Sequence, residues 1–522
     1  MSQPLTRAVT PGVYAESDIL RAWRLTDPRD DKTRIANSKD PLLDGSCSWI
    51  FDDPAFTRWW NDDECRILWI HGDPGKGKTM MMMAIVDEIS RRVKSEPGLG
   101  MLSYFFCQST IQGLSSANAI VRGLAFLLSA QNSRLTCHLR KKYEEAGDGL
   151  FEGANSLFSM WTTFIELLQD AAVRRYYLMV DALDECDSTS TETFLRLLTQ
   201  GVPDLPKAKW IVTSRNEPRI VKHLRDARQS HDTSLELNSS HVARAVRSFI
   251  DFKVGELARQ MKYNSELEGY IRGYLDDHAD GTFLWVSLVC KELEKVKSRR
   301  AREACATFPA GLDPLYQRMM EQMQREDDCK EMLQVLRTMT VACRPLNLSE
   351  VGVIANLPED LSSDTQDLLD LIASCGSFLT VRDRTIDFVH KSAKDYFTDG
   401  GGSTIFPSGQ ARAQHEMANR LLNIMSRWLK RDVCHLGIIG MTREQVDVSC
   451  VEKYLPQYVW YACSFWVEHI KRGESQLKVY DQVHKFLREH FLHWLEALGL
   501  IGKVADSIPM LSDLQRMLKV SS

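Results

Sequence analysis

The sequence predicts an α/β fold in its first half, with a parallel sheet and helices on both faces, followed by a largely helical second half. Short apolar runs alternate with amphipathic segments from about residue 64 to about residue 230, as expected for parallel strands joined by helices. Beyond residue 235, apolar residues recur mainly at the helical period. A glycine-rich stretch also separates the first apolar run from the first amphipathic segment, which is typical of a strand–loop–helix unit.

The sheet is predicted from four apolar runs, each of a length suited to one strand. These candidate strands are Ile67–His71, Leu102–Phe106, Tyr177–Asp181 and Trp210–Ser214. The amphipathic segments between them are predicted to form helices at Met80–Val93, Ala117–Ala130 and Leu157–Ala172.

The second half is predicted to be helical, with one exception. Helical periodicity is clear at Tyr270–Tyr274 and Phe283–Val296. The segment SFLTVRDRTIDFVH instead alternates like two strands, and we expect a β-hairpin that turns near Asp383. Tryptophan and histidine residues close to the C-terminus recur at helical spacing, so we interpret them as packing residues of a helical bundle rather than as ligands.

The composition is that of a globular protein with several domains. The 522 residues are 44% hydrophobic and 26% charged, and this length suggests roughly three to four domains. The 65 Lys and Arg residues against 70 Asp and Glu residues give a net charge of −5. There is therefore no basic excess that would favour nucleic acid as a partner.

Cysteine usage and the missing membrane signals predict a cytoplasmic protein. The 13 cysteines are scattered without a C-x-x-C pair, which argues against both a disulfide framework and a zinc site. The N-terminus lacks the charged and then apolar profile of a secretory signal. No apolar run approaches the ~18 residues that a membrane span requires.

A phosphate-binding loop is predicted directly after the first strand. Glycines let the backbone wrap closely enough for several N–H groups to converge on one phosphate, and the dipole of the following helix favours the same anion. In the motif G-x-x-x-x-G-K-[ST], the lysine supplies a full charge to the β- and γ-phosphates and the final hydroxyl is offered to Mg²⁺. The chain meets this motif in full, and the candidate nucleotide-binding residues are Gly72, Asp73, Pro74, Gly75, Lys76, Gly77, Lys78, Thr79 and Met80.

Acidic residues follow the third predicted strand, where a magnesium nucleotide requires them. In the segment RYYLMVDALDECD, Asp181 lies at the end of the strand and, with Thr79, is assigned to Mg²⁺. Glu185 is the candidate that orients the attacking water, and Asp184 is its close rival. Arg215 ends the next strand, in KWIVTSR, and is either a sensor of the γ-phosphate or a plain surface arginine.

These features together predict an α/β P-loop NTPase whose cofactors are a nucleotide and Mg²⁺. The N-K-x-D guanine signature of Ras-like GTPases is absent, because Asn37-Ser-Lys-Asp40 has the wrong order. ATP and ADP are therefore the expected nucleotides, and GTP stays a second candidate.

Four segments, LWIHGDPGKGKT, YLMVDALDEC, WIVTSR and DGTFLW, together resemble the NACHT nucleoside triphosphatases of the STAND P-loop class, specifically the fungal NOD-like receptors. The prologue DKTRIANSKDPLLDGSCSWIF and the later IDFVHKSAKDYF resemble two further segments of that family. The resemblance therefore spans about residues 18–500. One departure is Ala182, where the acidic motif of the family often has glycine.

The resemblance implies a signal-transduction switch that is closed with ADP and assembles with ATP. It implies slow hydrolysis, self-association in the triphosphate state and an unidentified protein effector, with roles in fungal innate immunity or heterokaryon incompatibility. It also implies that His390 contacts the phosphate of the closed state, whereas the residue considered alone is more readily a structural histidine. The effector domain and the repeat array that commonly flank the family's switch are expected to be missing here.

The resemblance also sets an expected order of domains. Residues 1–18 are expected to be poorly ordered, and residues 19–63 form a prologue to a NACHT nucleotide-binding domain at 64–230. A helical domain at 231–305, a winged-helix domain at 306–400 and a C-terminal helical domain at 401–522 are expected to follow.

Two other classes of function stay open at this point. A P-loop metabolic kinase or translocating ATPase would need an acceptor site or a substrate-engaging loop, and the sequence shows no recognisable signature of either. A non-hydrolysing scaffold would keep the loop as a structural nucleotide clamp, but the intact acids after the third strand weigh against it. Turnover separates the classes, because kinases work at about 1–100 per second and a switch should be far slower.

Overall fold

The computed structural model describes residues 14–520 except 44, 97, 110, 112, 152, 154, 226, 228–229, 237, 383, 400–401, 438–444 and 474–476. The chain folds into two compact units, Met1–Gly311 and Leu312–Ser522. This division lies close to the boundary expected at residues 305 and 306, and the finer domain order stays a prediction.

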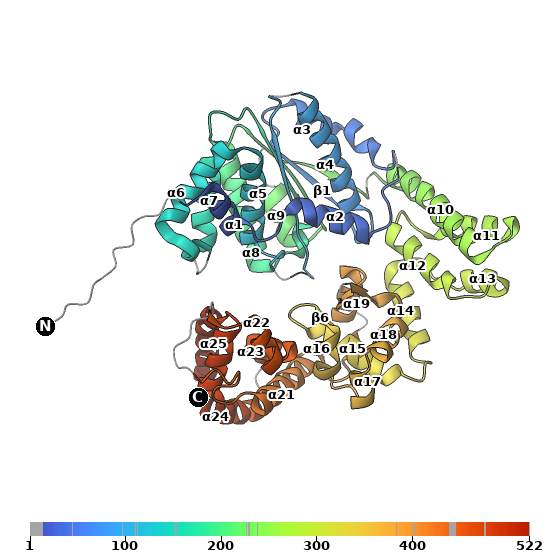
Figure 1. Cartoon of the computed structure of the whole chain (residues 1–522). Helices are drawn as coiled ribbons and strands as arrows, with labels where there is room; N and C mark the ends of the chain where they lie inside the picture. The colour runs from blue at the N-terminus through green and yellow to red at the C-terminus, as the bar shows by residue number, and fades with distance from the viewer. Residues whose placement is uncertain are drawn as a thin grey trace. The chain divides into compact units, whose positions relative to one another are not determined.

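The first unit is built on a parallel sheet, which contains β1 in Figure 1. Five strands form this sheet in the order β2-β3-β4-β1-β5. Its strands are β1 Ile67–His71, β2 Met101–Phe106, β3 Tyr176–Asp181, β4 Ala208–Ser214 and β5 Ser230–Ser234. The four predicted strands are thus confirmed, and each ends at the predicted residue. The edge strand β5 was not predicted, because its sequence SHDTS has no apolar run to mark it.

Helices cover the sheet and continue beyond it in this unit. They are α1 Glu16–Trp23, α2 Pro28–Ser38, α3 Pro54–Asn61, α4 Lys78–Ser95, α5 Ala117–Gln131, α6 Thr136–Ala146, α7 Ser156–Leu168, α8 Ser188–Gly201, α9 Pro218–Arg225, α10 Ser239–Met261, α11 Ser265–His278, α12 Phe283–Glu294 and α13 Ser298–Cys305. The helices expected between the strands and at Phe283–Val296 are confirmed. Helix α1 begins inside the segment 1–18 that was expected to be poorly ordered, and residues 1–13 lie outside the described residues.

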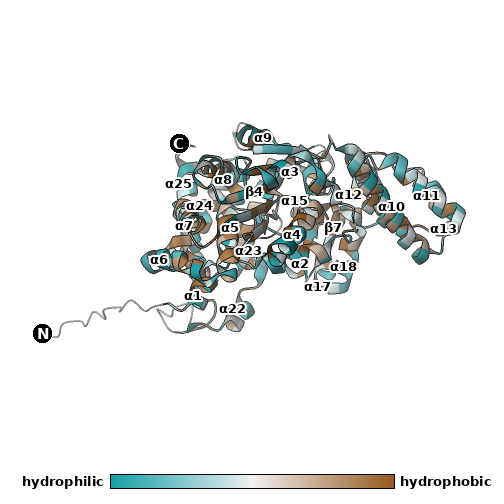
Figure 2. Ribbon diagram, turned by 90° about the horizontal axis from the view of Figure 1, so that it is seen from above, coloured by the Kyte–Doolittle hydropathy of each residue, from teal (hydrophilic) through white to brown (hydrophobic). Residues whose placement is uncertain are grey.

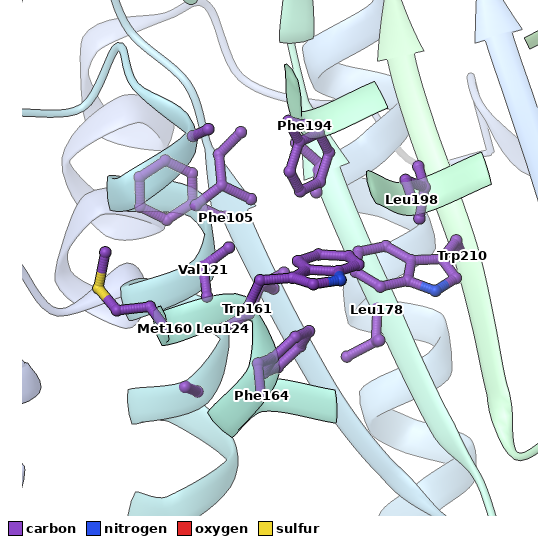
Figure 3. Packing of buried hydrophobic residues seen from close by; sticks show 14 of the residues in the cluster. Phe105, Val121, Leu124, Met160, Trp161, Phe164, Leu178, Phe194, Leu198 and Trp210 are labelled. Carbon is purple, nitrogen blue, oxygen red and sulfur yellow. The ribbon is translucent and has the colours of Figure 1, made fainter. Parts of the chain in front are cut away.

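Both faces of the sheet are buried, as a parallel sheet requires. On one face, Trp161 of α7 stacks on Trp210 of β4 with ring centroids 6.4 Å apart, and Phe164 meets the same indole edge-on (Figure 3). On the other face, Trp60 of α3 stacks on Tyr177 of β3 at 5.2 Å. Hydrophobic residues accordingly run along α5 and the strands, while α6 at the periphery is mostly hydrophilic (Figure 2). The carboxyl ends of the strands are left to carry the loops of the site.

The second unit is mainly helical. Its helices are α14 Leu312–Met323, α15 Cys329–Val341, α16 Leu348–Ile354, α17 Glu359–Ser363, α18 Thr365–Ser374, α19 Lys391–Thr398, α20 Gly402–Ile405, α21 Gln410–Trp428, α22 Val448–Tyr454, α23 Gln457–Arg472, α24 Leu477–Leu500 and α25 Ser507–Val520. A three-stranded antiparallel sheet of order β6-β8-β7 contains β6 Leu346–Asn347, β7 Leu379–Arg382 and β8 Thr385–Phe388. The predicted hairpin is therefore confirmed, although Asp383 at its turn lies outside the described residues.

The predicted fold class is confirmed, namely an α/β unit of the P-loop NTPase type followed by a mostly helical remainder. Within the described ranges, no helix has the length and apolarity needed to cross a membrane.

Candidate nucleotide-binding site

The glycine-rich loop connects the end of β1 to the start of α4 at the carboxyl edge of the sheet. Gly75 and Gly77 have φ angles of +78° and +89°, in the left-handed region that favours glycine. Helix α4 begins at Lys78, so its first N–H groups face the loop. Pro74 lies within the loop and Met80 in the first turn of the helix. The strand–loop–helix context predicted for this motif is confirmed.

Two of the loop glycines are also required by the segment DGTFLW, residues 280–285, which packs against the loop. A Cβ atom built on Gly75 or on Gly77 would come within 3.0 Å of side chains in this segment. The ammonium of Lys76 donates a hydrogen bond to the carbonyl oxygen of Asp280. The sequence motif that the resemblance singled out therefore forms one wall of the loop.

The first glycine is required by a different neighbour, the chain that leaves the edge strand β5. A Cβ atom built on Gly72 would lie 3.0 Å from both Glu236 Oε1 and Leu235 Cβ. The backbone N–H of Asp73 donates to the same carboxylate oxygen of Glu236 at 2.6 Å. Neither contact was foreseen from the sequence.

Lys78 carries the fixed charge of the loop. Its Nζ donates to the carbonyl oxygen of Gly72 and, at 2.9 Å, to that of Asp73. Burial lowers the pKa of Lys78 to about 8, against the opposing effect of the nearby carboxylates of Asp184 and Asp181. A bound phosphate would compensate this desolvated cation, which is the role that the motif assigns to it.

The two predicted magnesium ligands lie close together. The side chain of Thr79 is near enough to the carboxylate of Asp181, which is 2% exposed, to act on its pKa. Thr213 Oγ1 donates to Asp181 Oδ1 at 2.6 Å and accepts the N–H of Ala182 at 2.8 Å. Burial raises the pKa of Asp181, while these two hydroxyls and the charge of Lys39 act to lower it. A hydroxyl and a carboxylate beside a phosphate loop form the oxygen donor set that Mg²⁺ prefers when it also binds a nucleotide.

The other acids and the arginine are held by distinct partners. Asp184 is nearly buried and accepts the backbone N–H of Arg215 at 3.1 Å, while Arg215 Nε lies 3.2 Å from its second carboxylate oxygen. Glu185 Oε2 accepts the backbone N–H of Ser109 at 3.1 Å, on the connection after β2. The structure therefore brings the predicted residues from three strand ends together, and it pairs two of them with each other.

His390 belongs to the second unit, so its predicted phosphate contact stays a prediction. It is the N-cap residue of α19, and its Nδ1 accepts the backbone N–H of Ser392 at 3.1 Å. The hydroxyl of Ser392 lies 2.8 Å from the same nitrogen and 2.9 Å from the hydroxyl of Tyr316. The local role of this histidine is to cap a helix.

Sequence reasoning missed two residues of the site, Thr213 and Glu236. Thr213 carried a signal, because it is a polar residue that directly follows the apolar run WIV in the same strand. The structure shows that it is fully buried. No feature of the sequence marked Glu236, because it follows a polar strand that resembles a loop.

Known proteins resemble the part of the chain that contains the loop and the neighbouring strand ends. The family model "Nephrocystin 3, N-terminal" matches residues 45–215, which include the loop and the ends of β3 and β4. The chain is 38% identical over 517 residues to the vegetative incompatibility protein HET-E-1 of Podospora anserina. That alignment covers 95% of this chain and 38% of HET-E-1, so the chain spans well under half the length of this relative.

Solved structures also resemble the chain, at low similarity. A Walker-type ATPase of Pyrococcus abyssi is 12% identical with a TM-score of 0.33, over 72% of this chain and 99% of that one. The ORC1 protein of Aeropyrum pernix, solved in complex with DNA, is 12% identical with a TM-score of 0.32, over 70% of this chain and 96% of that one.

The long alignment with HET-E-1 is the strongest evidence for the resemblance. It runs through all four motifs, including the loop, the acidic strand end and the segment DGTFLW that packs on the loop. The resemblance predicted from these motifs is thereby confirmed, because the chain is similar to a fungal incompatibility protein over nearly its whole length.

Proposed function

We propose that this chain is a signalling switch that binds ATP with Mg²⁺ and hydrolyses it slowly. The observation that carries the proposal is a complete phosphate loop at the start of α4, beside the buried carboxylate of Asp181 that Thr213 holds at 2.6 Å. Each of these features has a direct use with a magnesium nucleotide and little use without one.

The residues present fit a magnesium nucleotide. Thr79 and Asp181 would hold the Mg²⁺, while the loop N–H groups and Lys78 would hold the β- and γ-phosphates. The bound metal would supply charge neutralisation at the γ-phosphate. The protein itself contributes a fixed arrangement, because Thr213 orients the Asp181 carboxylate through a 2.6 Å hydrogen bond.

The two neighbouring acids, Asp184 and Glu185, have different partners. Asp184 is engaged by both the backbone and the guanidinium of Arg215, which favours a role in positioning that arginine toward the γ-phosphate. Glu185 is the next residue, and its carboxylate instead accepts the backbone N–H of Ser109, which follows β2. We therefore assign the orientation of the attacking water to Glu185.

The switch is proposed to act in fungal incompatibility or innate immunity. The support is the 38% identity to a vegetative incompatibility protein across 95% of this chain. In this proposal ADP holds a closed form in the cytoplasm, ATP permits self-association, and a protein effector of unidentified type receives the signal. GTP is the alternative nucleotide, because the motifs of the loop and of the strand ends recognise phosphate and Mg²⁺ and do not distinguish the base.

The deciding experiment is to identify the nucleotide that co-purifies with the full chain. We expect ADP at close to one equivalent, together with single-turnover ATP hydrolysis far below the ~1–100 per second of kinases. Recovery of GDP would change the nucleotide assignment. Absence of any bound nucleotide, combined with no detectable binding of ADP or ATP in titration calorimetry, would reject the proposal.

A further inference from the structure

We propose that Glu236 is a positioning residue of the nucleotide site, whose carboxylate fixes the start of the phosphate loop and, through it, the ammonium of Lys78. The inference rests on the proposed nucleotide binding and adds a residue from outside the motifs of the site. It assigns a function to the edge strand β5.

The position of Glu236 follows from the pairing of β5 with β1. The two strands are parallel and in register, with His71 opposite Ser234. One further hydrogen bond, from the N–H of Leu235 to the carbonyl of His71 at 2.9 Å, carries the pairing to the end of β1. The next residue, Glu236, is thereby delivered to the point where β1 becomes the loop.

Both carboxylate oxygens of Glu236 have a donor. Oε1 accepts the backbone N–H of Asp73 at 2.6 Å, and Oε2 accepts the hydroxyl of Ser234 at 3.0 Å. The Ser234 contact holds the carboxylate in place on its own strand, and the Asp73 contact reaches the loop. An amide that donates to an ionised carboxylate forms a stronger hydrogen bond than one that donates to a neutral acceptor.

The loop segment that Glu236 contacts at Asp73 also accepts hydrogen bonds from Lys78. Its Nζ donates to the carbonyl oxygens of Gly72 and Asp73. The segment at residues 72–73 therefore binds two charged groups. Its N–H at Asp73 donates to the carboxylate of Glu236, and its two carbonyl oxygens accept from the ammonium of Lys78. Moving this segment would move the cation that has to meet the phosphates.

The close packing at Gly72 supports a fixed position over a loose one. A single added Cβ there would lie 3.0 Å from Glu236 Oε1 and 3.0 Å from the side chain of Leu235. The first glycine of the loop motif is thus explained in this chain by the approach of β5. An anchor that close leaves the loop little freedom to shift.

The test compares three variants of the full chain with the wild type by calorimetric titration with ADP and with a non-hydrolysable ATP analogue. Glu236→Ala removes the acceptor, and we expect about tenfold weaker binding of both nucleotides. Glu236→Gln keeps an oxygen at the same reach, so we expect its affinity to stay within threefold of the wild type. Glu256→Ala, which removes a carboxylate on α10 that forms an ion pair with Lys253 at 3.6 Å, is the matched control and should leave binding unchanged.

Rescue by glutamine separates an anchoring hydrogen bond from a merely structural side chain. Wild-type affinity in Glu236→Ala would overturn the inference, and so would equal losses in the Gln and Ala variants. If Glu236→Ala does not fold, Glu236→Asp withdraws the carboxylate by one methylene and is expected to show the same loss. A wild-type chain that binds no nucleotide would instead reject the proposed function, so the two failures remain distinguishable.

Discussion

Lys78 is the residue on which the site depends most directly. Its ammonium is desolvated enough that its pKa falls to about 8, and it is bonded to carbonyl oxygens of its own loop. A bound triphosphate would exchange those neutral acceptors for anionic ones, which is a gain that only a fixed cation at this position provides.

We expect Lys78→Ala to abolish measurable nucleotide binding, because it removes this charge and leaves the loop glycines in place. Lys94→Ala, at the other end of α4, is the matched control and should bind as the wild type does. Calorimetric titration with ADP and ATP measures both. Retained affinity in Lys78→Ala would show that the loop binds no phosphate.

The neighbouring acids yield a second prediction. Glu185→Gln should bind ATP within about threefold of the wild type and slow hydrolysis by about 10²–10⁴-fold, because it removes the group that orients the water and spares Asp181. Asp184→Asn should also lose about 1–3 kcal/mol of stability, since it removes the ionic partner of a largely buried arginine. Single-turnover assays measure the hydrolysis rate of both variants, and thermal unfolding measures their stability. Normal hydrolysis in Glu185→Gln with none in Asp184→Asn would exchange the two roles.

At the scale of elements, sequence reasoning succeeded where burial dictates composition. Strands β1, β3 and β4 are buried throughout, and a strand buried on both faces is mostly apolar, with its polar residues concentrated here at the carboxyl ends. The loop motif was equally readable, because phosphate geometry restricts which residues fit it.

What the sequence did not reveal are contacts between segments far apart in the chain. β5 is an edge strand whose polar sequence carries no period, so neither the strand nor Glu236 was foreseen. The motif DGTFLW was noticed, but its packing on the loop was not, because about 200 residues separate the two segments and no local pattern encodes that approach. The sequence alone therefore predicted the candidate phosphate and magnesium ligands. The distant segments that pack against them became visible only in the structure.

The helices of the second unit contain a buried histidine with a consequence for acid stability. His469 of α23 is fully buried, and it lies 2.5 Å from Gln414 Oε1 and 2.8 Å from the hydroxyl of Tyr461. Burial lowers the pKa of His469 to about 3, so the folded protein retains the neutral imidazole. The unfolded chain binds a proton near pH 6.5. The stability contributed by the neutral form is therefore fully present above pH 6.5 and is lost as the pH falls toward 3.

We expect this single group to remove about 2 kcal/mol of stability between pH 7.5 and pH 5. In His469→Gln, which has no proton to bind, the stability difference from the wild type should shrink by that amount over the same range. Unfolding of the full chain followed by tryptophan fluorescence measures it, since Trp466 lies on the same helix. His484→Gln, at an exposed site, is the control and should keep the wild-type pH dependence. Parallel curves for His469→Gln and the wild type would contradict the lowered pKa.

At the scale of the whole molecule, a switch requires that the state of the nucleotide in the first unit be read by the second. The resemblance to the NACHT proteins implies that His390 senses the bound nucleotide, and this role stays a prediction. The local structure suits the task chemically, because Nδ1 accepts the N–H of Ser392 and the ring proton is therefore assigned to Nε2. A neutral imidazole with its proton on Nε2 is able to donate to a phosphate oxygen.

The N-cap role of His390 determines how the phosphate contact has to be tested. His390→Ala would remove the cap as well as the imidazole and should cost about 1 kcal/mol of stability in the nucleotide-free protein. His390→Asn keeps a capping oxygen and removes only the ring, so its nucleotide-free stability should match the wild type.

If the imidazole holds the phosphate of bound ADP, both variants should release ADP about 10–100-fold faster, because one hydrogen bond to a charged group contributes about 1.5–3 kcal/mol. Losing that contact from the closed form alone shifts the equilibrium toward the open form by the same factor. Both variants should then self-associate more readily with ATP. Stopped-flow release of fluorescent ADP and light scattering measure the two effects. Wild-type release in His390→Asn, with faster release only in His390→Ala, would mean that this histidine caps α19 and does not contact the nucleotide.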